Sequence, residues 1–121
     1  MSAQIVLFGK DPVLLETRQR ILERAGFDCL PVSGIGQLMQ LAQQEDVELL
    51  VLCSSLEQIE SRAVLSAIDG LGRTDLKRLV LTKDKAAFPA QGETEIVETP
   101  TTPQRFLSLV EAAVGTSLSG L

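Results

Sequence analysis

Histidine, tryptophan and tyrosine are absent from this chain of 121 residues. Without histidine the chain lacks the commonest general base and the commonest metal ligand. It also lacks the residue that carries phosphate in phosphorelay donors, and a Cys–His nucleophile is impossible. The four phenylalanines are its only aromatic residues, so the hydrophobic core must be aliphatic. Many enzyme classes are excluded on these grounds.

Positive charge and long apolar runs are also scarce. Lysine and arginine number 11 against 16 acidic residues, and the net charge of -5 repels the phosphate backbone of nucleic acids. No apolar run approaches the ~20 residues that a membrane span needs, and residues 1–4 lack the basic region of a signal peptide. We therefore expect no direct nucleic-acid binding, no membrane association and a cytoplasmic location.

The two cysteines, Cys29 and Cys53, are too few for the disulfide framework of a small secreted domain. The aliphatic runs around them place Cys29 on the second strand of a sheet and Cys53 at the end of the third. If both strands flank the first strand, they lie roughly 9.5 Å apart, which is beyond the reach of a disulfide. We expect two free thiols.

Short aliphatic runs alternate with helical patterns along the chain. Each run is typical of a strand buried on both faces, and the five runs are residues 5–8, 29–32, 49–52, 79–81 and 96–97. The helical patterns place apolar residues on one face, in four sets: Leu14, Ile21, Leu22 and Ala25; Ile35, Leu38, Met39 and Ala42; Val64, Leu65, Ile68 and Leu71; Phe106, Leu109, Val110 and Ala113.

Strict alternation with short connections predicts an α/β fold, a three-layer doubly wound parallel sheet of five strands in the flavodoxin-like order 2-1-3-4-5. Residues 83–94 contain Pro89 and Gly92, so the helix between the fourth and fifth strands should be short or missing. We expect one domain over residues 1–115 and a flexible tail over residues 116–121.

The working residues of such a sheet lie just past the carboxyl ends of its strands, between strands 1 and 3. Here the first strand ends in Gly9 and Lys10, and the third ends in Cys53. Cys53 is either a reactive thiol activated by Lys10 or a small apolar side chain that ends a buried strand. Both interpretations stay open.

A small anion site is a further hypothesis for the same edge, because a cation and several hydroxyls suit a phosphate or sulfate ion. Its contacts would be Lys10, Ser54 and Thr82. The alternative is a solvated loop rim, in which Lys10 pairs with Asp11, Asp84 or Glu98. These residues suggest no enzyme, no cofactor and no metal.

Five segments in order resemble a response-regulator receiver domain of the CheY-like kind. They are IVLFGKDP at residues 5–12, LERAGF at 22–27, ELLVL at 48–52, LVLT at 79–82 and TP at 99–100. Each segment is a generic α/β signal, but their combined spacing covers nearly the whole chain. Proline after the first strand, alanine-glycine-aromatic after the first helix and proline after the fifth strand make the resemblance fairly specific.

The resemblance implies a chemistry that this chain has lost. Receivers hold Mg²⁺ with an acidic pair at the end of the first strand, and the matching residues here are Gly9 and Lys10. Receivers accept a phosphoryl group on an aspartate at the end of the third strand, and the matching residue here is Cys53. Their conserved lysine falls on Thr99, and their switch residues fall on Thr82 and Ile96, so that only the threonine is retained. Magnesium prefers carboxylate oxygens, and the ammonium group of Lys10 would repel it.

The expected function is therefore that of a degenerate receiver, or pseudo-receiver, in two-component (phosphorelay) signal transduction. It would act as a protein–protein interaction module that does not depend on phosphorylation. Its partner would be a signalling protein or an output domain, and it could form a homodimer. The alternative function is a small anion or redox sensor that uses Lys10 and Cys53.

Overall fold

The computed structural model describes residues 4–44, 47–53, 58–70, 76–82, 94–98 and 102–114. In these ranges strands and helices follow in the order β1 (Gln4–Phe8), α1 (Pro12–Arg24), β2 (Asp28–Val32), α2 (Ile35–Ala42), β3 (Val47–Leu52), α3 (Gln58–Asp69), β4 (Lys77–Thr82), β5 (Thr94–Glu98) and α4 (Pro103–Val114). None of the helices in the described ranges is long and apolar enough to cross a membrane.

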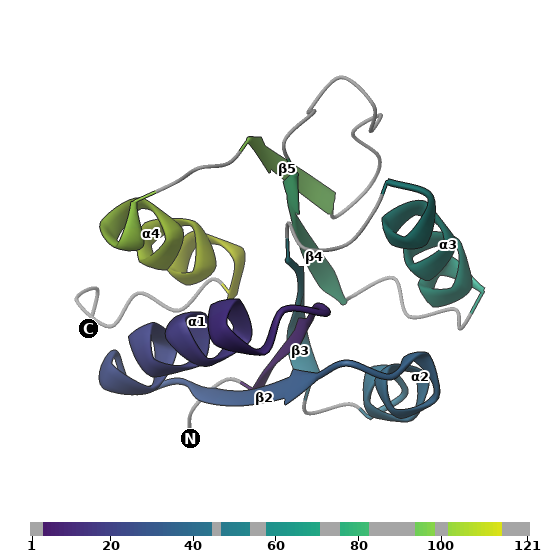
Figure 1. Cartoon of the computed structure of the whole chain (residues 1–121), viewed down its shortest axis with the longest axis horizontal. Coiled ribbons are helices and arrows are strands. Elements are labelled where there is room, and N and C mark those ends of the chain that lie inside the picture. The colour runs from purple at the N-terminus through teal and green to yellow at the C-terminus, as the bar shows by residue number, and fades with distance from the viewer. Residues whose placement is uncertain are drawn as a thin grey trace.

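The five strands form one parallel sheet in the order β2-β1-β3-β4-β5. Helices α1 and α4 cover one face, and α2 and α3 cover the other (Figure 1). The predicted fold class and strand order are confirmed. The segment predicted to hold a short or missing helix, residues 83–93, lies outside the described residues, as does the tail at 116–121.

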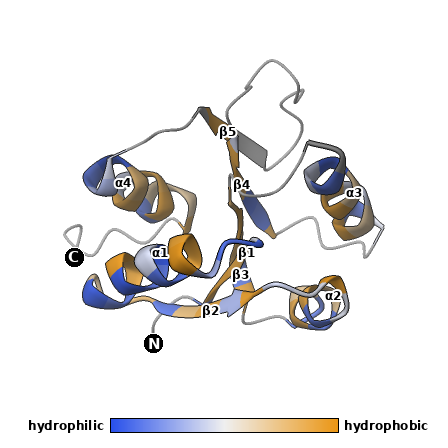
Figure 2. Ribbon diagram, in the orientation of Figure 1, coloured by the Kyte–Doolittle hydropathy of each residue, from blue (hydrophilic) through white to orange (hydrophobic). Residues whose placement is uncertain are grey.

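Two mainly aliphatic cores, which also contain Phe8, Phe27 and Phe106, fill the space between the sheet and its helices. Alternate residues of each strand point to opposite faces, so Ile5 and Leu7 pack under α1 and α4 while Val6 and Phe8 pack under α2 and α3. Figure 2 shows this most clearly for α4, whose apolar residues face the sheet. Both cysteines are buried and free, as expected.

Local sequence signals account for the ends of α1. The carboxylate of Asp11 accepts hydrogen bonds from the backbone N–H groups of Val13 (3.0 Å) and Leu14 (3.3 Å), and Pro12 occupies the first turn, where its missing N–H costs nothing. Gly26 has a φ of +93°, a conformation that favours glycine, and it turns the chain into β2. Proline and glycine signals in the sequence therefore mark the two ends of this helix.

The buried face of α1 differs from the predicted one. The pattern placed Leu14, Ile21, Leu22 and Ala25 on that face, whereas the structure buries Leu15, Arg18 and Leu22 most deeply. Leu14, Ile21 and Ala25 are only partly buried at its margin. The helix therefore turns the charged residue Arg18 toward the core, and a pattern of apolar residues alone does not predict this.

Helix α3 is also longer than its apolar pattern. The pattern marked Val64 to Leu71, but the helix already begins at Gln58 and ends at Asp69. Its first turn carries Glu60, which becomes important at the carboxyl edge of the sheet.

We expect Asp11→Ala to lower the free energy of unfolding by about 1 kcal/mol, because it removes the acceptor for two N–H groups of α1. Urea denaturation measures the loss. Asp11→Asn keeps a side-chain acceptor and should retain most of the stability. An equal loss in both variants would show that the carboxylate acts in some way other than as a cap.

Candidate functional site

The ends of β1 and β3 lie side by side at the carboxyl edge of the sheet. Phe8 is in register with Leu52, and one residue further the N–H of Cys53 donates to the carbonyl of Phe8 at 2.9 Å. The N–H of Gly9 donates to the carbonyl of Val32 at 3.2 Å, so Gly9 is held between its neighbours. The predicted meeting of these strand ends is confirmed.

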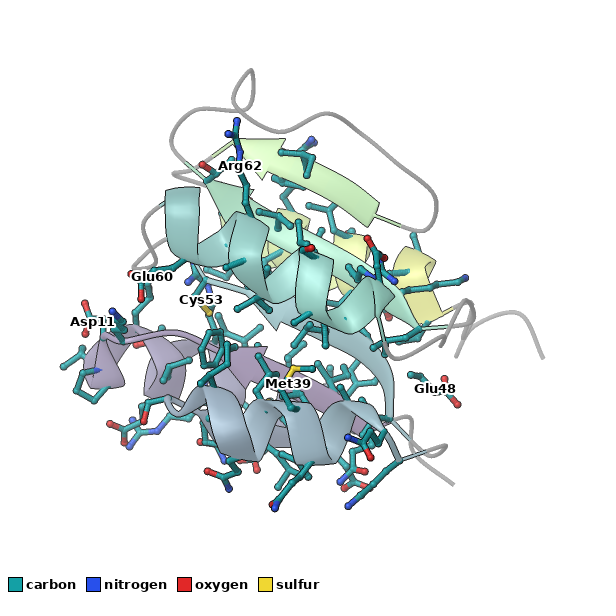
Figure 3. All side chains as sticks on the ribbon, turned by 90° about the vertical axis from the view of Figure 1, so that its right-hand side faces the viewer. Asp11, Met39, Glu48, Cys53, Glu60 and Arg62 are labelled. Atoms are coloured by element: carbon teal, nitrogen blue, oxygen red, sulfur yellow. The ribbon has the colours of Figure 1, made fainter. Side chains whose placement is uncertain are left out.

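Lys10 forms an ion pair with Glu60, in the first turn of α3. Glu60 was not among the partners that the sequence indicated for this lysine. Figure 3 shows Asp11, Glu60 and Cys53 at the same end of the molecule, with Glu48 at the opposite end. The pair joins the loop after β1 to the start of α3, and the Lys10 and Glu60 side chains remain 57% and 32% exposed.

Cys53 is 1% exposed and lies in the core under α1 and α4. Burial raises the pKa of its thiol, while the charge of Arg18 and a hydrogen bond from the Arg18 side chain act in the opposite direction without cancelling that rise. Burial also raises the pKa of the Cys29 thiol, to about 12. Because the thiolate is the nucleophilic form, both cysteines have the properties of structural thiols.

Arg18 is a cation that acts on the Cys53 thiol, and the sequence analysis did not single it out. Its side chain is buried, with 8% of the residue exposed. The guanidinium carbon lies 5.7 Å from the centre of the Phe106 ring, a cation–π distance. Its Nη1 atom is buried and has no hydrogen-bond partner. Arg18 thus connects α1 with the end of β3 and with α4.

Thr82 and Ile96, which the resemblance matches to the switch residues of a receiver, are both buried. Thr82 ends β4 and is 8% exposed, and Ile96 on β5 is 6% exposed, in the core under α2 and α3. Ile96 is aliphatic, so this position has no aromatic ring that could rotate inward. Ser54 and Thr99 lie outside the described residues.

The residues at this edge do not fit a magnesium ion. Magnesium requires an octahedral set of oxygen ligands, usually with one or two carboxylates. Gly9 offers no side chain, Lys10 brings a cation bonded to Glu60, and Cys53 brings a buried thiol. Across the described ranges, no three side chains of the metal-binding types come together.

Solved structures share the fold of this chain at low sequence identity. The signal receiver domain of an HD domain-containing protein from Pseudomonas fluorescens Pf-5 superposes with a TM-score of 0.78 at 21% identity, over 95% of this chain and 96% of that chain. A CheY-like response regulator receiver domain from Methanospirillum hungatei JF-1 superposes with a TM-score of 0.77 at 16% identity, over 95% of each chain. The chain has the receiver-domain fold.

A third solved structure has this fold and contains a magnesium ion. The receiver domain of a sensor histidine kinase from Pseudomonas aeruginosa PAO1 matches with a TM-score of 0.72 at 14% identity, over 96% of this chain and all of that chain, and it was solved with a magnesium ion coordinated in its active-site cleft. No protein-family model and no curated protein matches the sequence.

We expect both thiols of the native protein to react slowly with a disulfide reagent at mildly alkaline pH, because each is buried and its raised pKa keeps it protonated. Unfolding in denaturant should release two reactive thiols per chain. Ser33→Cys, at an exposed position, provides a fast-reacting control. Rapid labelling of Cys53 in the native chain would contradict the buried geometry.

The Lys10–Glu60 pair should contribute about 0.2–1 kcal/mol to stability, since both side chains are partly exposed. A double-mutant cycle with Lys10→Met and Glu60→Gln measures this coupling free energy, which added salt should weaken. Arg20→Gln, which breaks the exposed pair between Arg20 and Glu16 within α1, serves as the control. A zero coupling at low salt would mean that the pair does not hold α3 to the loop after β1.

Proposed function

We propose that this protein is a degenerate receiver, a signalling module that binds its partner without being phosphorylated. The observation that carries the proposal is the set of side chains at the carboxyl edge of a receiver fold. Where the resemblance calls for three carboxylates the chain has Gly9, Lys10 and Cys53. A phosphoryl group would find neither an acceptor carboxylate nor a metal ion to neutralise its charge.

The internal contacts of the edge support the same conclusion. The ammonium group of Lys10 is joined to Glu60, and the thiol of Cys53 accepts a hydrogen bond from Arg18. Through these internal side-chain contacts the strand ends are linked to α3 and α1. Without a phosphoryl group to shift an equilibrium between two states, the recognised surface must be set by the sequence.

Some of the structures with this fold come from named signalling proteins, and this supports a signalling protein as the partner of this chain. One of the similar domains comes from a sensor histidine kinase, and another structure with this fold is a two-component transcriptional regulator from Clostridium phytofermentans ISDg. We infer that the partner is a signalling protein or an output domain, and that a second copy of this chain is the other candidate. The net charge of -5 argues against nucleic acid as a direct partner.

We also infer a cytoplasmic location. Two free thiols are typical of a reducing compartment, where disulfides do not persist.

Incubation with acetyl phosphate and Mg²⁺, followed by intact-mass measurement, tests the loss of phosphorylation. We expect no mass gain of a phosphoryl group, because a thiol at position 53 cannot form the acyl phosphate that a carboxylate forms. A receiver domain with its aspartate and acidic pair provides the positive control. A stoichiometric phosphoryl adduct on this chain would overturn the proposal.

The alternative function, a sensor that uses Lys10 and Cys53, has weaker support. A redox sensor needs an accessible thiol of low pKa, whereas Cys53 is 1% exposed and its pKa is raised. An anion site at Lys10 would compete with the carboxylate of Glu60 for the same ammonium group.

A further inference from the structure

Helix α3 is held to its neighbours by an ion pair at each end, and α4 is not. Glu60, in the first turn of α3, pairs with Lys10 in the loop after β1. Asp69, the last residue of α3, pairs with Arg78 of β4 at 2.5 Å. None of the ion pairs found among the described residues involves a residue of α4. In that part of the chain, the burial of its apolar face is what holds α4 in place.

Arg18 of α1 is a buried charge that lies against α4. The residue is 8% exposed, and its guanidinium carbon lies 5.7 Å from the centre of the Phe106 ring of α4. Arginine stays protonated in proteins, and none of the ion pairs among the described residues includes Arg18. Its Nη1 atom is shut off from solvent and has no hydrogen-bond partner. A buried charge without an anion beside it costs free energy for as long as it is kept from water.

The docking of α4 therefore has two opposing contributions. The burial of Phe106 and Val110, which are 2% and 0% exposed, favours the docked helix. The loss of water around Arg18 opposes docking, and the attraction between the cation and the Phe106 ring offsets only part of that cost. The balance between these contributions is fixed by the sequence.

The topology allows α4 to separate from the sheet as a unit. All five strands of the described sheet precede α4 in the chain, so its departure breaks no hydrogen bond between strands. The N-terminal cap of α4 is local, because Thr102 accepts hydrogen bonds from the backbone N–H groups of Arg105 at 3.1 Å and Phe106 at 2.9 Å. The helix lies beside α1 and over β3 and β4 (Figure 1).

We propose that α4 is a detachable cover, which opens as one unit while the five-stranded sheet stays folded, and that the uncompensated charge of Arg18 promotes this opening. The open state returns the guanidinium to water. It also exposes two apolar surfaces together, the buried face of α4 and the residues of β3 and β4 beneath it. An equilibrium of this kind needs no phosphoryl group to populate its second state. The opening is independent of the interaction role proposed above, so either can fail alone.

Hydrogen exchange of the native chain at low urea concentrations measures the opening. We expect the amides of residues 107–114 to exchange together, with one shared urea dependence that is smaller than that of the central amides of β1 and β3. The strand amides should exchange only through global unfolding. Equal free energies and equal urea dependences for α4 and the strands would overturn the proposal. Exchange of the α4 amides one by one, without urea dependence, would also overturn it, since that behaviour is fraying.

Arg18→Met tests whether the charge promotes the opening. The variant removes the charge and keeps much of the apolar stem, so the α4 amides should exchange about tenfold or more slowly than in the native chain. Arg20→Met removes an exposed arginine from the same helix and should leave the exchange of α4 unchanged. Faster exchange of α4 in Arg18→Met would show that Arg18 stabilises the docked helix, and the proposal would be wrong. Arg18→Leu is a second apolar replacement, and failure of both variants to fold would lead to the same conclusion.

Phe106→Leu tests whether Arg18 acts through its contact with α4. The change removes the ring but keeps an apolar side chain. It should speed the exchange of α4 more in the native background than in Arg18→Met, because the attraction of the ring for the cation is lost only where the cation is present. An equal acceleration in both backgrounds would mean that Arg18 and α4 are not coupled, and it would overturn the proposal.

Discussion

The parallel pairing of β1 with β3 at the centre of the sheet decides which residues meet at its carboxyl edge. The register of Phe8 with Leu52, extended by the hydrogen bond from Cys53 to Phe8, brings the two strand ends together whatever side chains they carry. The same backbone geometry that would gather carboxylates around a metal ion gathers Gly9, Lys10 and Cys53 in this chain. The backbone therefore sets where the strand ends meet, and the side chains there determine which chemistry is possible.

Two cations near this edge, Lys10 and Arg18, differ in burial, and burial determines how strong their interactions are. Lys10 and Glu60 are partly exposed, so their attraction is screened by water and is worth at most about 1 kcal/mol. Arg18 is buried, and removing its charge from water costs several kcal/mol unless other groups compensate. The ring of Phe106 can return about 2 kcal/mol or more to a desolvated cation, and the sulfur of Cys53 adds a weak hydrogen bond.

The sequence predicted the fold well because the fold rests on local signals: aliphatic runs, Pro12 in the first turn of α1 and the turn at Gly26. It did not predict the contacts of the site, since these depend on charged residues that hydrophobic periodicity ignores. Arg18 could have been found, because it lies three residues after Leu15 and four before Leu22, on the face that the structure buries. Glu60 could not, since α3 begins well before its apolar pattern does. Ion-pair partners across loops are set by tertiary geometry, which one sequence without relatives does not reveal.

We propose that internal contacts stand in place of a receiver's metal and phosphoryl chemistry at this edge. A titration with magnesium gluconate, monitored at the backbone amides of Gly9, Lys10 and Cys53, tests it most directly. We expect no saturable shift at these amides, because no three side chains of the metal-binding types come together among the described residues and Lys10 brings a cation to the edge. Saturable magnesium binding that shifts Gly9 and Cys53 together would contradict the claim and show that the edge still works as a receiver's metal site.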